Sequence, residues 1–298
     1  MNIKLKKLPL SGGERGPGGE SEWTTIITPQ KSLFDLKLGE VWRYRDLLTL
    51  FVRRDFVAQY KQTILGPLWH FVQPVLTTIM FTVVFGKLAG IPTDGVPPML
   101  FYLAGLTNWN YFSACLTGTA NTFVGNQGIF GKVYFPRLVT PLSIVLSNMI
   151  KYGIQLLLFA GFYVYFLIQG TQIQPNGYIL LFPILIVLLA GMGLGFGLII
   201  TSMTTKYRDL SVLLTFGVQL FMYATPVIYP LSQVPERYQL YAVLNPMTSV
   251  IETFKYGFLG QGTFSWGHLG YSAAFTVMLL LLGVVVFNKT ERNFMDTV

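Results

Sequence analysis

Residues 178–203 read YILLFPILIVLLAGMGLGFGLIITSM, a stretch without a single charged side chain. A helix needs about 20 mostly apolar residues to cross a hydrocarbon core about 30 Å thick. Backbone N–H and C=O groups cannot stay unpaired in lipid, so a stretch of this length must be a helix rather than an open strand. It predicts a transmembrane helix, and with it an integral membrane protein.

The composition of the whole chain agrees with this prediction. Of the 298 residues, 52% are hydrophobic and only 11% are charged, whereas a soluble domain carries about 25% charged residues. The net charge of +8 is expected from basic residues on the cytoplasmic side of a membrane, and no nucleic-acid partner is predicted. Cys115 is the only cysteine, which excludes a disulfide-stapled fold.

Five other stretches satisfy the same length criterion, which predicts an all-α protein with six transmembrane helices. Turn-forming Gly, Pro and Asn residues separate them, and Pro226 and Pro230 are expected to kink or end the fifth. The six predicted spans are Leu68–Leu88, Pro98–Ala120, Leu142–Ile168, Tyr178–Met203, Leu210–Tyr229 and His268–Phe287.

Lys and Arg residues are unevenly distributed between the loops. With a cytoplasmic N-terminus, eleven of them lie in the N-terminal arm from Lys4 to Lys61. The positive-inside rule therefore predicts that both termini are cytoplasmic. The other cytoplasmic cations would be Lys132, Arg137, Lys206, Arg208, Lys289 and Arg292, against Lys87, Arg237 and Lys255 on the opposite side.

The chain before the first span divides into two segments. Residues 1–39 form a low-complexity cytoplasmic arm, which we expect to be disordered. Residues 40–66 contain a predicted amphipathic helix, Asp46–Lys61, in which Leu48, Val52 and Phe56 share one face. This helix either lies in the membrane interface or is a plain cytoplasmic helix. Residues 67–298 then form the predicted six-helix domain.

Lys151 is the ionisable residue that lies well inside a predicted span. Its side chain either snorkels towards the cytoplasm or faces a wet path near an anionic substrate group. The spans contain no chain of Asp, Glu and His residues of the kind that proton-coupled pumps use. No metal-ligand spacing and no nucleophile with its base is evident, so we expect neither a metal site nor an enzyme.

The fourth span contains Gly191-Met-Gly-Leu-Gly-Phe-Gly197, two overlapping G-x-x-x-G pairs. Such pairs let helices approach closely, and the apolar flanks argue against a nucleotide-binding loop.

Aromatic residues recur in the second and fifth spans. They either pack against neighbouring helices or line a pathway on which sugar rings slide. They are Trp109, Tyr111, Phe112, Phe216, Phe221 and Tyr223, with the polar neighbours Asn108, Asn110 and Gln219.

The outer segment between the fifth and sixth spans is too apolar to be a linker. Asn245-Pro246 predicts the start of a helix and Gly260 its end. Met247, Val250, Ile251, Phe254 and Phe258 share one face of this helix, whereas Glu252 and Lys255 lie on another. We expect a re-entrant helical segment that caps a pathway.

The cytoplasmic loop from Gly125 to Pro141 combines turn formers, aromatic residues and two cations. This mixture is typical of an interfacial anchor, and equally of a short helix that binds a cytoplasmic partner.

Several motifs together resemble the membrane subunit of ABC-2-type exporters, specifically the permeases that export lipid-linked polysaccharides such as O antigen. The resemblance covers about residues 40 to 290, and the motifs follow the family's order. They are Tyr60-Lys-Gln-Thr-Ile-Leu-Gly-Pro-Leu-Trp69 with Pro74, Lys132-Val-Tyr-Phe-Pro-Arg137 with Pro141-Leu-Ser143, Tyr207-Arg-Asp-Leu210, Thr225-Pro-Val-Ile-Tyr229 and Asn245-Pro-Met247.

The resemblance implies a homodimer in the bacterial inner membrane with a channel between the two copies. It also implies two copies of a cytoplasmic ATPase subunit, which would hold the ATP and Mg²⁺, so that this chain needs no cofactor. The substrate would be a glycan on undecaprenyl diphosphate, moved from cytoplasm to periplasm. The helix from Asp46 to Lys61 would be the interface helix, and residues 234–260 the outer gate.

The same resemblance assigns expected roles to individual residues. Coupling to the ATPase would involve Asn126, Ile129, Phe130, Lys132, Tyr134, Phe135 and Arg137. Apart from the resemblance, the aromatic pattern predicts a channel lining that includes Trp109, Tyr111, Phe112, Phe216 and Tyr223. We also expect an anionic substrate group to contact Lys151, Arg53 and Arg54. The outer gate would include Pro246, Met247 and Phe254.

Two alternatives stay open at this point. One alternative to the polysaccharide permease is an ABC-2 permease for another substrate, such as a drug, a lipid or a teichoic-acid-like polymer. The other is a membrane-embedded glycosyl- or acyltransferase. The printed sequence contains no G-x-x-x-x-G-K-[ST] loop, so energy for uphill export is expected from another chain.

Overall fold

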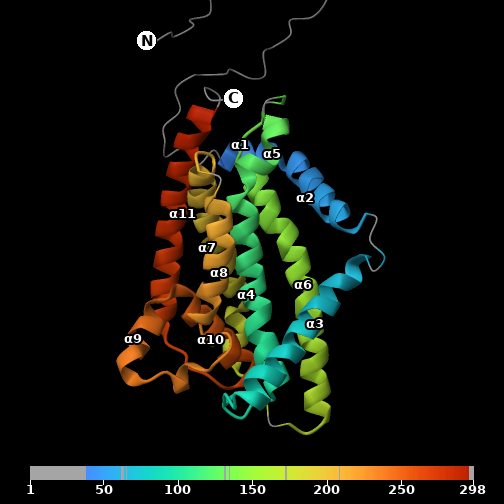
Figure 1. Cartoon of the computed structure of the whole chain (residues 1–298), viewed down its shortest axis with the longest axis vertical. Helices are drawn as coiled ribbons and strands as arrows, with labels where there is room; N and C mark the ends of the chain where they lie inside the picture. Colours follow the sequence, from blue (N-terminus) through green and yellow to red (C-terminus); the bar gives the residue numbers. More distant parts are fainter. Residues whose placement is uncertain are drawn as a thin grey trace, which may run out of the picture. The chain divides into compact units, whose positions relative to one another are not determined.

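A computed structural model describes residues 38–61, 64, 66–130, 132–133, 135–171, 173–207 and 209–294. The chain divides into two units, Met1–Ser32 and Leu33–Val298, and every described residue belongs to the second unit. All regular elements among these residues are helical (Figure 1). The prediction of an all-α protein is confirmed for this part of the chain, whereas the predicted disordered arm, 1–39, lies almost wholly outside it.

The helices follow the predicted spans closely. Besides short 3₁₀ turns at Gly66–Leu68, Gly177–Leu181 and Leu231–Gln233, a π-helical segment, Thr82–Leu88, continues α3. The α-helices are α1 (Leu38–Arg43), α2 (Arg45–Tyr60), α3 (Trp69–Phe81), α4 (Pro98–Ala120), α5 (Thr122–Phe130), α6 (Val139–Ile168), α7 (Phe182–Thr204), α8 (Leu210–Tyr223), α9 (Glu236–Leu244), α10 (Pro246–Leu259) and α11 (Trp266–Phe294).

Four helical segments of the described chain are long and apolar enough to cross a membrane. They are Trp69–Leu88, Val139–Ile168, Gly177–Thr204 and Trp266–Glu291, which correspond to the first, third, fourth and sixth predicted spans. The second predicted span forms α4, which has sufficient length at 23 residues but is not among these four. The fifth forms α8, with only 14 residues.

The fifth predicted span was too long at its outer end. The helix α8 stops at Tyr223, and residues 224–229 form a turn. Pro226 explains this stop because it has no N–H for the helical hydrogen bond and its ring disfavours helical geometry at Thr225. The side chains of Val227 and Ile228 are buried in this turn.

The glycines of residues 191–197 place α7 between two other helices, α4 and α11. A Cβ atom on Gly197 would lie 2.4 Å from the Cβ of Thr119 on α4, and one on Gly191 would lie 2.6 Å from the Cγ2 of Thr276 on α11. Both distances are shorter than carbon atoms tolerate, so only glycine permits these contacts. The predicted packing role of the two G-x-x-x-G pairs is confirmed.

One end of this unit holds α1, α2, α5 and the end of α11, while α9 and α10 lie at the other end (Figure 1). A cluster of aromatic side chains joins the elements of the first end. The rings of Phe51 and Phe135 meet edge to face at 5.6 Å, and those of Phe123 and Phe287 stack at 4.8 Å. We call this group, which also includes Phe130, the cytoplasmic cluster, after the side of the membrane on which the sequence predicts it.

The predicted helix of the outer segment is α10, and its end signals behave as expected. The Asn245 side chain caps its start by accepting a hydrogen bond from the Met247 N–H at 3.0 Å. Gly260 ends it with a left-handed φ of 74°, a conformation that glycine adopts without strain. Both faces of α10 are buried, including Glu252 and Lys255.

Candidate functional site

A polar groove lies between α3, α4 and α6. It consists of two adjoining cavities of about 260 Å³ and about 370 Å³, which share Ala114, Asn148 and Lys151 in their walls. The first lies along α3, and the second reaches Asp55 on α2. The two cavities together are the polar groove discussed below.

Helical periodicity explains how apolar spans build a polar groove. On α6 its walls include Asn148, Lys151 and Gln155, and on α3 they include His70, Gln73 and Thr77. Residues three or four apart share one face of a helix. Each helix therefore presents a single polar stripe, and the two stripes face the same cavity.

Lys151 is the cation of this groove. It lies about 18 Å along the axis of α6 from Val139, at about 1.5 Å per residue, and so deep in a membrane span. Its Nζ donates a hydrogen bond to Asn148 Oδ1 at 2.8 Å, one turn nearer the start of α6. The side chain thus points along the snorkelling direction and also lines the groove. Ionisable groups at such depth usually face a wet cavity and mark a substrate path.

The groove also contains groups that offer further hydrogen bonds. The buried hydroxyl of Ser147 lines the second cavity and makes no hydrogen bond. On the opposite wall, Asn110 Nδ2 donates to Gln155 Oε1 at 3.5 Å, a long hydrogen bond. A ligand that accepts hydrogen bonds would find the Lys151 ammonium and these weakly paired groups together.

The two predicted arginines occupy different positions. Arg54 Nη2 pairs with Asp55 Oδ1 at 2.8 Å, and its guanidinium stands 4.6 Å from the centre of the Phe51 ring. Because Asp55 lines the second cavity, this ion pair places Arg54 beside the groove. Arg53 is exposed on α2 and does not line either cavity.

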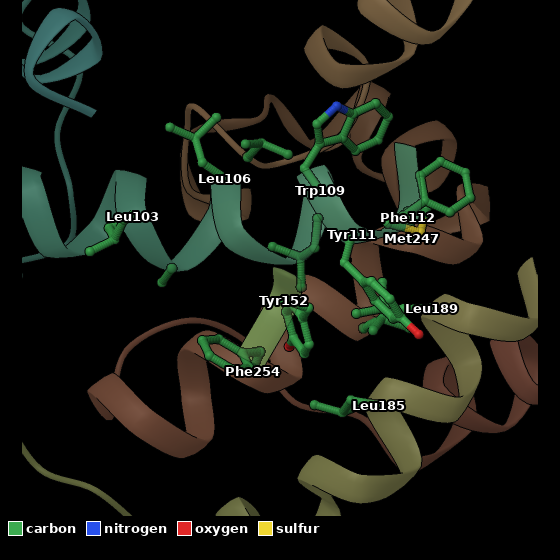
Figure 2. Packing of buried hydrophobic residues seen from close by; sticks show 14 of the residues in the cluster. Leu103, Leu106, Trp109, Tyr111, Phe112, Tyr152, Leu185, Leu189, Met247 and Phe254 are labelled. Carbon is green, nitrogen blue, oxygen red and sulfur yellow. The ribbon is translucent and has the colours of Figure 1, made fainter. Parts of the chain in front are cut away.

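The aromatic residues that we expected in a channel lining separate into two groups. Trp109, Tyr111 and Phe112 on α4 are buried among side chains of neighbouring helices (Figure 2). Trp109 and Phe112 line neither cavity, whereas Tyr111, although buried, lines the first cavity of the polar groove. By contrast, Phe216 and Tyr223 on α8 are 59% and 52% exposed, so their channel-lining role stays a prediction.

The predicted coupling segment, residues 125–137, has a buried side and an exposed side. Phe130 and Phe135 belong to the cytoplasmic cluster, so these aromatic residues are buried rather than displayed. Asn126 and Ile129 are half-buried, and Lys132 is exposed. Tyr134 lies outside the described residues.

Arg137 fastens this segment to the last helix. It is buried, and its Nη1 donates to the Glu291 carbonyl at 3.1 Å. Its guanidinium also stands 5.4 Å from the centre of the Phe130 ring. Burial lowers the pKa of Arg137, and the nearby Glu291 carboxylate opposes that effect. Arginine stays protonated despite such shifts, so we expect Arg137 to be a permanent cation that holds the segment in place.

Besides Lys132, the exposed residues in and next to the coupling segment include three that we did not single out from the sequence. Val124 on α5 is 48% exposed and Val133 is 58% exposed. Gln127 is exposed between them.

The residues predicted for the outer gate are packed inside this unit. Pro246 and Met247 are buried at the start of α10. The Phe254 ring lies 4.6 Å from that of Phe258 and 5.4 Å from that of Phe159 on α6. The gate role of these residues stays a prediction.

The profile of the family described as ABC-2 type transporter matches residues 46–259. The chain belongs to this family. The matched range begins in α2 and ends with α10, and it includes both the polar groove and the coupling segment.

Curated relatives match this ABC-2 permease along most of their length, and their names describe transport proteins. An O-antigen export system permease protein, RfbA of Myxococcus xanthus, is 28% identical over 87% of this chain and 98% of its own. An RfbA of Klebsiella pneumoniae is 25% identical over 84% and 94%. The polysialic acid transport protein KpsM of Escherichia coli is 22% identical over 82% and 93%. These relatives favour a transport subunit over an enzyme.

Proposed function

We propose that this ABC-2 permease is the membrane subunit of an ATP-driven exporter that moves an undecaprenyl-diphosphate-linked polysaccharide from cytoplasm to periplasm. The names of its relatives support polysaccharide as the cargo. Members of this family work with ATPase subunits, which supports ATP hydrolysis by a partner chain as the source of energy. The observation that carries the proposal is the polar groove, with Lys151 in its wall on the candidate membrane span Val139–Ile168.

The groove suits the charged part of such a substrate. A diphosphate is anionic and accepts several hydrogen bonds, and a low-dielectric site strengthens its attraction to a cation. We propose that Lys151 contacts this group, with Asn148 orienting the ammonium. Arg54, paired with Asp55 beside the groove, would meet the substrate where it enters.

All six predicted spans are proposed to cross the inner membrane, with both termini in the cytoplasm. α4 is the most polar of them, and most of its residues are enclosed by other helices. Its buried Asn108 accepts a hydrogen bond from the Tyr152 hydroxyl at 2.8 Å, so this amide has a partner inside the protein. α8 is about 21 Å long, and the turn of residues 224–229 that follows it lengthens the segment that would lie within the membrane.

The channel is proposed to form between two copies of the chain along α8. A single copy leaves a row of large apolar side chains exposed there, and lipid or a second copy must cover them. The row consists of Val212, Leu213, Phe216, Leu220 and Tyr223. Two aromatic faces in this row, Phe216 and Tyr223, offer the apolar contact on which sugar rings slide.

Coupling is proposed to occur through the exposed side of the coupling segment. An ATPase that binds Val124 and Val133 would push on α5, and the cytoplasmic cluster would pass this motion to α2 and α11. In this proposal, Phe130 and Phe135 transmit the motion and do not bind the partner.

Changing the exposed valines tests this division of roles. The double variant Val124→Asp, Val133→Asp is expected to lose co-purification with the ATPase, because it places carboxylates at an apolar contact. The fold should persist since both side chains are exposed. Tyr241→Asp is the control, since Tyr241 is exposed on α9 at the opposite end. Unchanged co-purification of the double variant would contradict the proposed contact.

Phe130→Ala tests the buried side. Removing this ring from the cytoplasmic cluster is expected to cost about 3–5 kcal/mol of stability. Thermal unfolding of the purified protein measures that loss, and a fully stable variant would contradict the role of Phe130 in the cluster.

The proposed function itself is tested by isolating the complex. The full chain, expressed together with the ATPase encoded beside its gene, should co-purify with that ATPase in detergent and stimulate ATP hydrolysis. A chain that purifies alone and converts a lipid-linked sugar without nucleotide would instead favour a membrane-embedded transferase.

A further inference from the structure

An ion pair is buried at the outer end of the described helices, away from the polar groove. Glu252 and Lys255 on α10 are each 1% exposed, and Lys255 Nζ lies 3.7 Å from Glu252 Oε1. Burial lowers the pKa of Lys255 to about 8, and the neighbouring Glu252 carboxylate opposes this effect. The carboxylate therefore helps Lys255 to keep its charge.

Lys255 connects three parts of the fold. Its Nζ donates a hydrogen bond of 2.6 Å to the carbonyl oxygen of Pro226, in the turn that follows α8. The same ammonium stands 3.8 Å from the centre of the Phe101 ring on α4. The Pro226 residue is buried three residues beyond the end of α8, and a buried carbonyl needs a hydrogen-bond donor. Lys255 thus holds the outer end of α8 against α10 and α4.

Glu252 is fixed from the other side. Its Oε2 accepts a hydrogen bond from the Thr263 N–H at 3.2 Å, in the connection to α11. The backbone of Gly262 approaches closely at a φ of 113°, and a Cβ atom there would lie 3.0 Å from Glu252 Oε2. The carboxylate is therefore oriented by the chain that leads to α11, and it in turn orients Lys255.

A second contact joins the same two elements. Asn245, at the start of α10, donates from Nδ2 to Thr225 Oγ1 at 2.9 Å and to the Ala224 carbonyl at 3.3 Å. Consequently, residues 224–226 are attached to α10 at two places, one at its start and one in its third turn. The end of α8 cannot move away from α10 without breaking both.

Stability alone does not account for this pair. Burying two charges is costly, and apolar residues of similar volume usually stabilise a protein as well or better. The contacts instead join the proposed channel wall, α8, to the proposed outer gate, α10. We propose that Lys255, oriented by Glu252, is a positioning residue that couples the outer end of α8 to α10, so that channel wall and outer gate move together.

This inference rests on the proposed function, and a double variant tests it. Glu252→Gln, Lys255→Met removes both charges, keeps an amide acceptor for Thr263 and leaves no unpaired buried ion. We expect ATP hydrolysis close to that of the wild type in the reconstituted complex with the ATPase, and a modestly lower thermal stability because the buried Pro226 carbonyl loses its donor. Export per ATP hydrolysed should fall by about fivefold or more, the lower range of coupling between sites.

The control is Lys87→Met, which removes an exposed cation from the π-helical segment after α3, outside residues 234–260. It should export like the wild type. Wild-type export by the Glu252→Gln, Lys255→Met variant would overturn the inference and leave the proposed function standing. Failure of the wild type to export would overturn the proposed function, and the inference with it.

A measurement on the unaltered protein keeps the inference testable if that double variant does not fold. Hydrogen exchange of residues 224–229 and 246–255 is followed in the complex with and without bound nucleotide. We expect the protection of both segments to change together. A change in one segment without the other, or in neither, would contradict the coupling.

Discussion

Replacing Lys151 by methionine is expected to lower export by about ten- to a hundredfold. A hydrogen bond to a charged group contributes about 1.5–3 kcal/mol, and about 1.4 kcal/mol corresponds to a factor of ten. The variant should insert at least as well as the wild type, because a central lysine costs about 2.5–3.5 kcal/mol on insertion scales. Export by reconstituted complexes, compared at equal amounts of folded protein, measures the effect.

Two further variants sharpen this test. Lys87→Met removes a cation at the outer end of the π-helical segment, where Lys87 is exposed, and should export normally. Lys151→Arg keeps the charge and should retain part of the activity. The retention should be only partial because the planar guanidinium fits less well into a site that holds a compact ammonium. If Lys151→Met exported like the wild type, the lysine would only be snorkelling.

Replacing Gly197 by leucine is expected to prevent α7 from packing against α4. The first added carbon would already lie 2.4 Å from the Cβ of Thr119 and 3.1 Å from the Leu116 carbonyl oxygen. Overpacking of a core costs about 1–3 kcal/mol and sometimes more, and here backbone atoms stand in the way. We expect little folded protein on size-exclusion chromatography in detergent.

Gly161→Leu is the matched control. Gly161 lies on α6, another membrane-spanning helix, and a Cβ atom there meets no other atom within 4 Å. This variant should give wild-type yield. Equal losses in both variants would mean that leucine disturbs these helices by itself, contrary to the packing of α7 described above.

The sequence predicts best those features that depend on one helix at a time. Hydropathy located α6, α7 and α11, because each is apolar over a membrane thickness. The capping residues Asn245 and Gly260 gave the bounds of α10 correctly, since caps act within a few residues of the chain. The glycine run in α7 predicted close packing, although not which neighbours it meets.

The candidate site depends on contacts between helices, and the sequence reveals less of it. The spacing of Asn148, Lys151 and Gln155 is a readable signal of a polar face on α6. The matching stripe on α3 is a similar signal, but the sequence alone does not indicate that the two stripes face each other. We therefore singled out Lys151, Asn110 and Tyr111 separately, without predicting that they line one groove.

The burial of two elements also escaped prediction. The aromatic residues Phe130 and Phe135 look exposed in a polar loop, but α2 and α11 cover them. Glu252 and Lys255 look like the polar face of a surface helix, whereas α4 and the turn after α8 enclose them. The opposite charges three residues apart in an apolar helix were the available signal.

The central claim is that this chain exports a lipid-linked polysaccharide only together with an ATPase. Proteoliposomes that contain the permease, with or without its ATPase, are supplied with the lipid-linked glycan on the cytoplasmic face, and its appearance on the opposite face is measured. The account predicts transfer only when both the ATPase and hydrolysable ATP are present. Transfer at the same rate by the permease alone would contradict it.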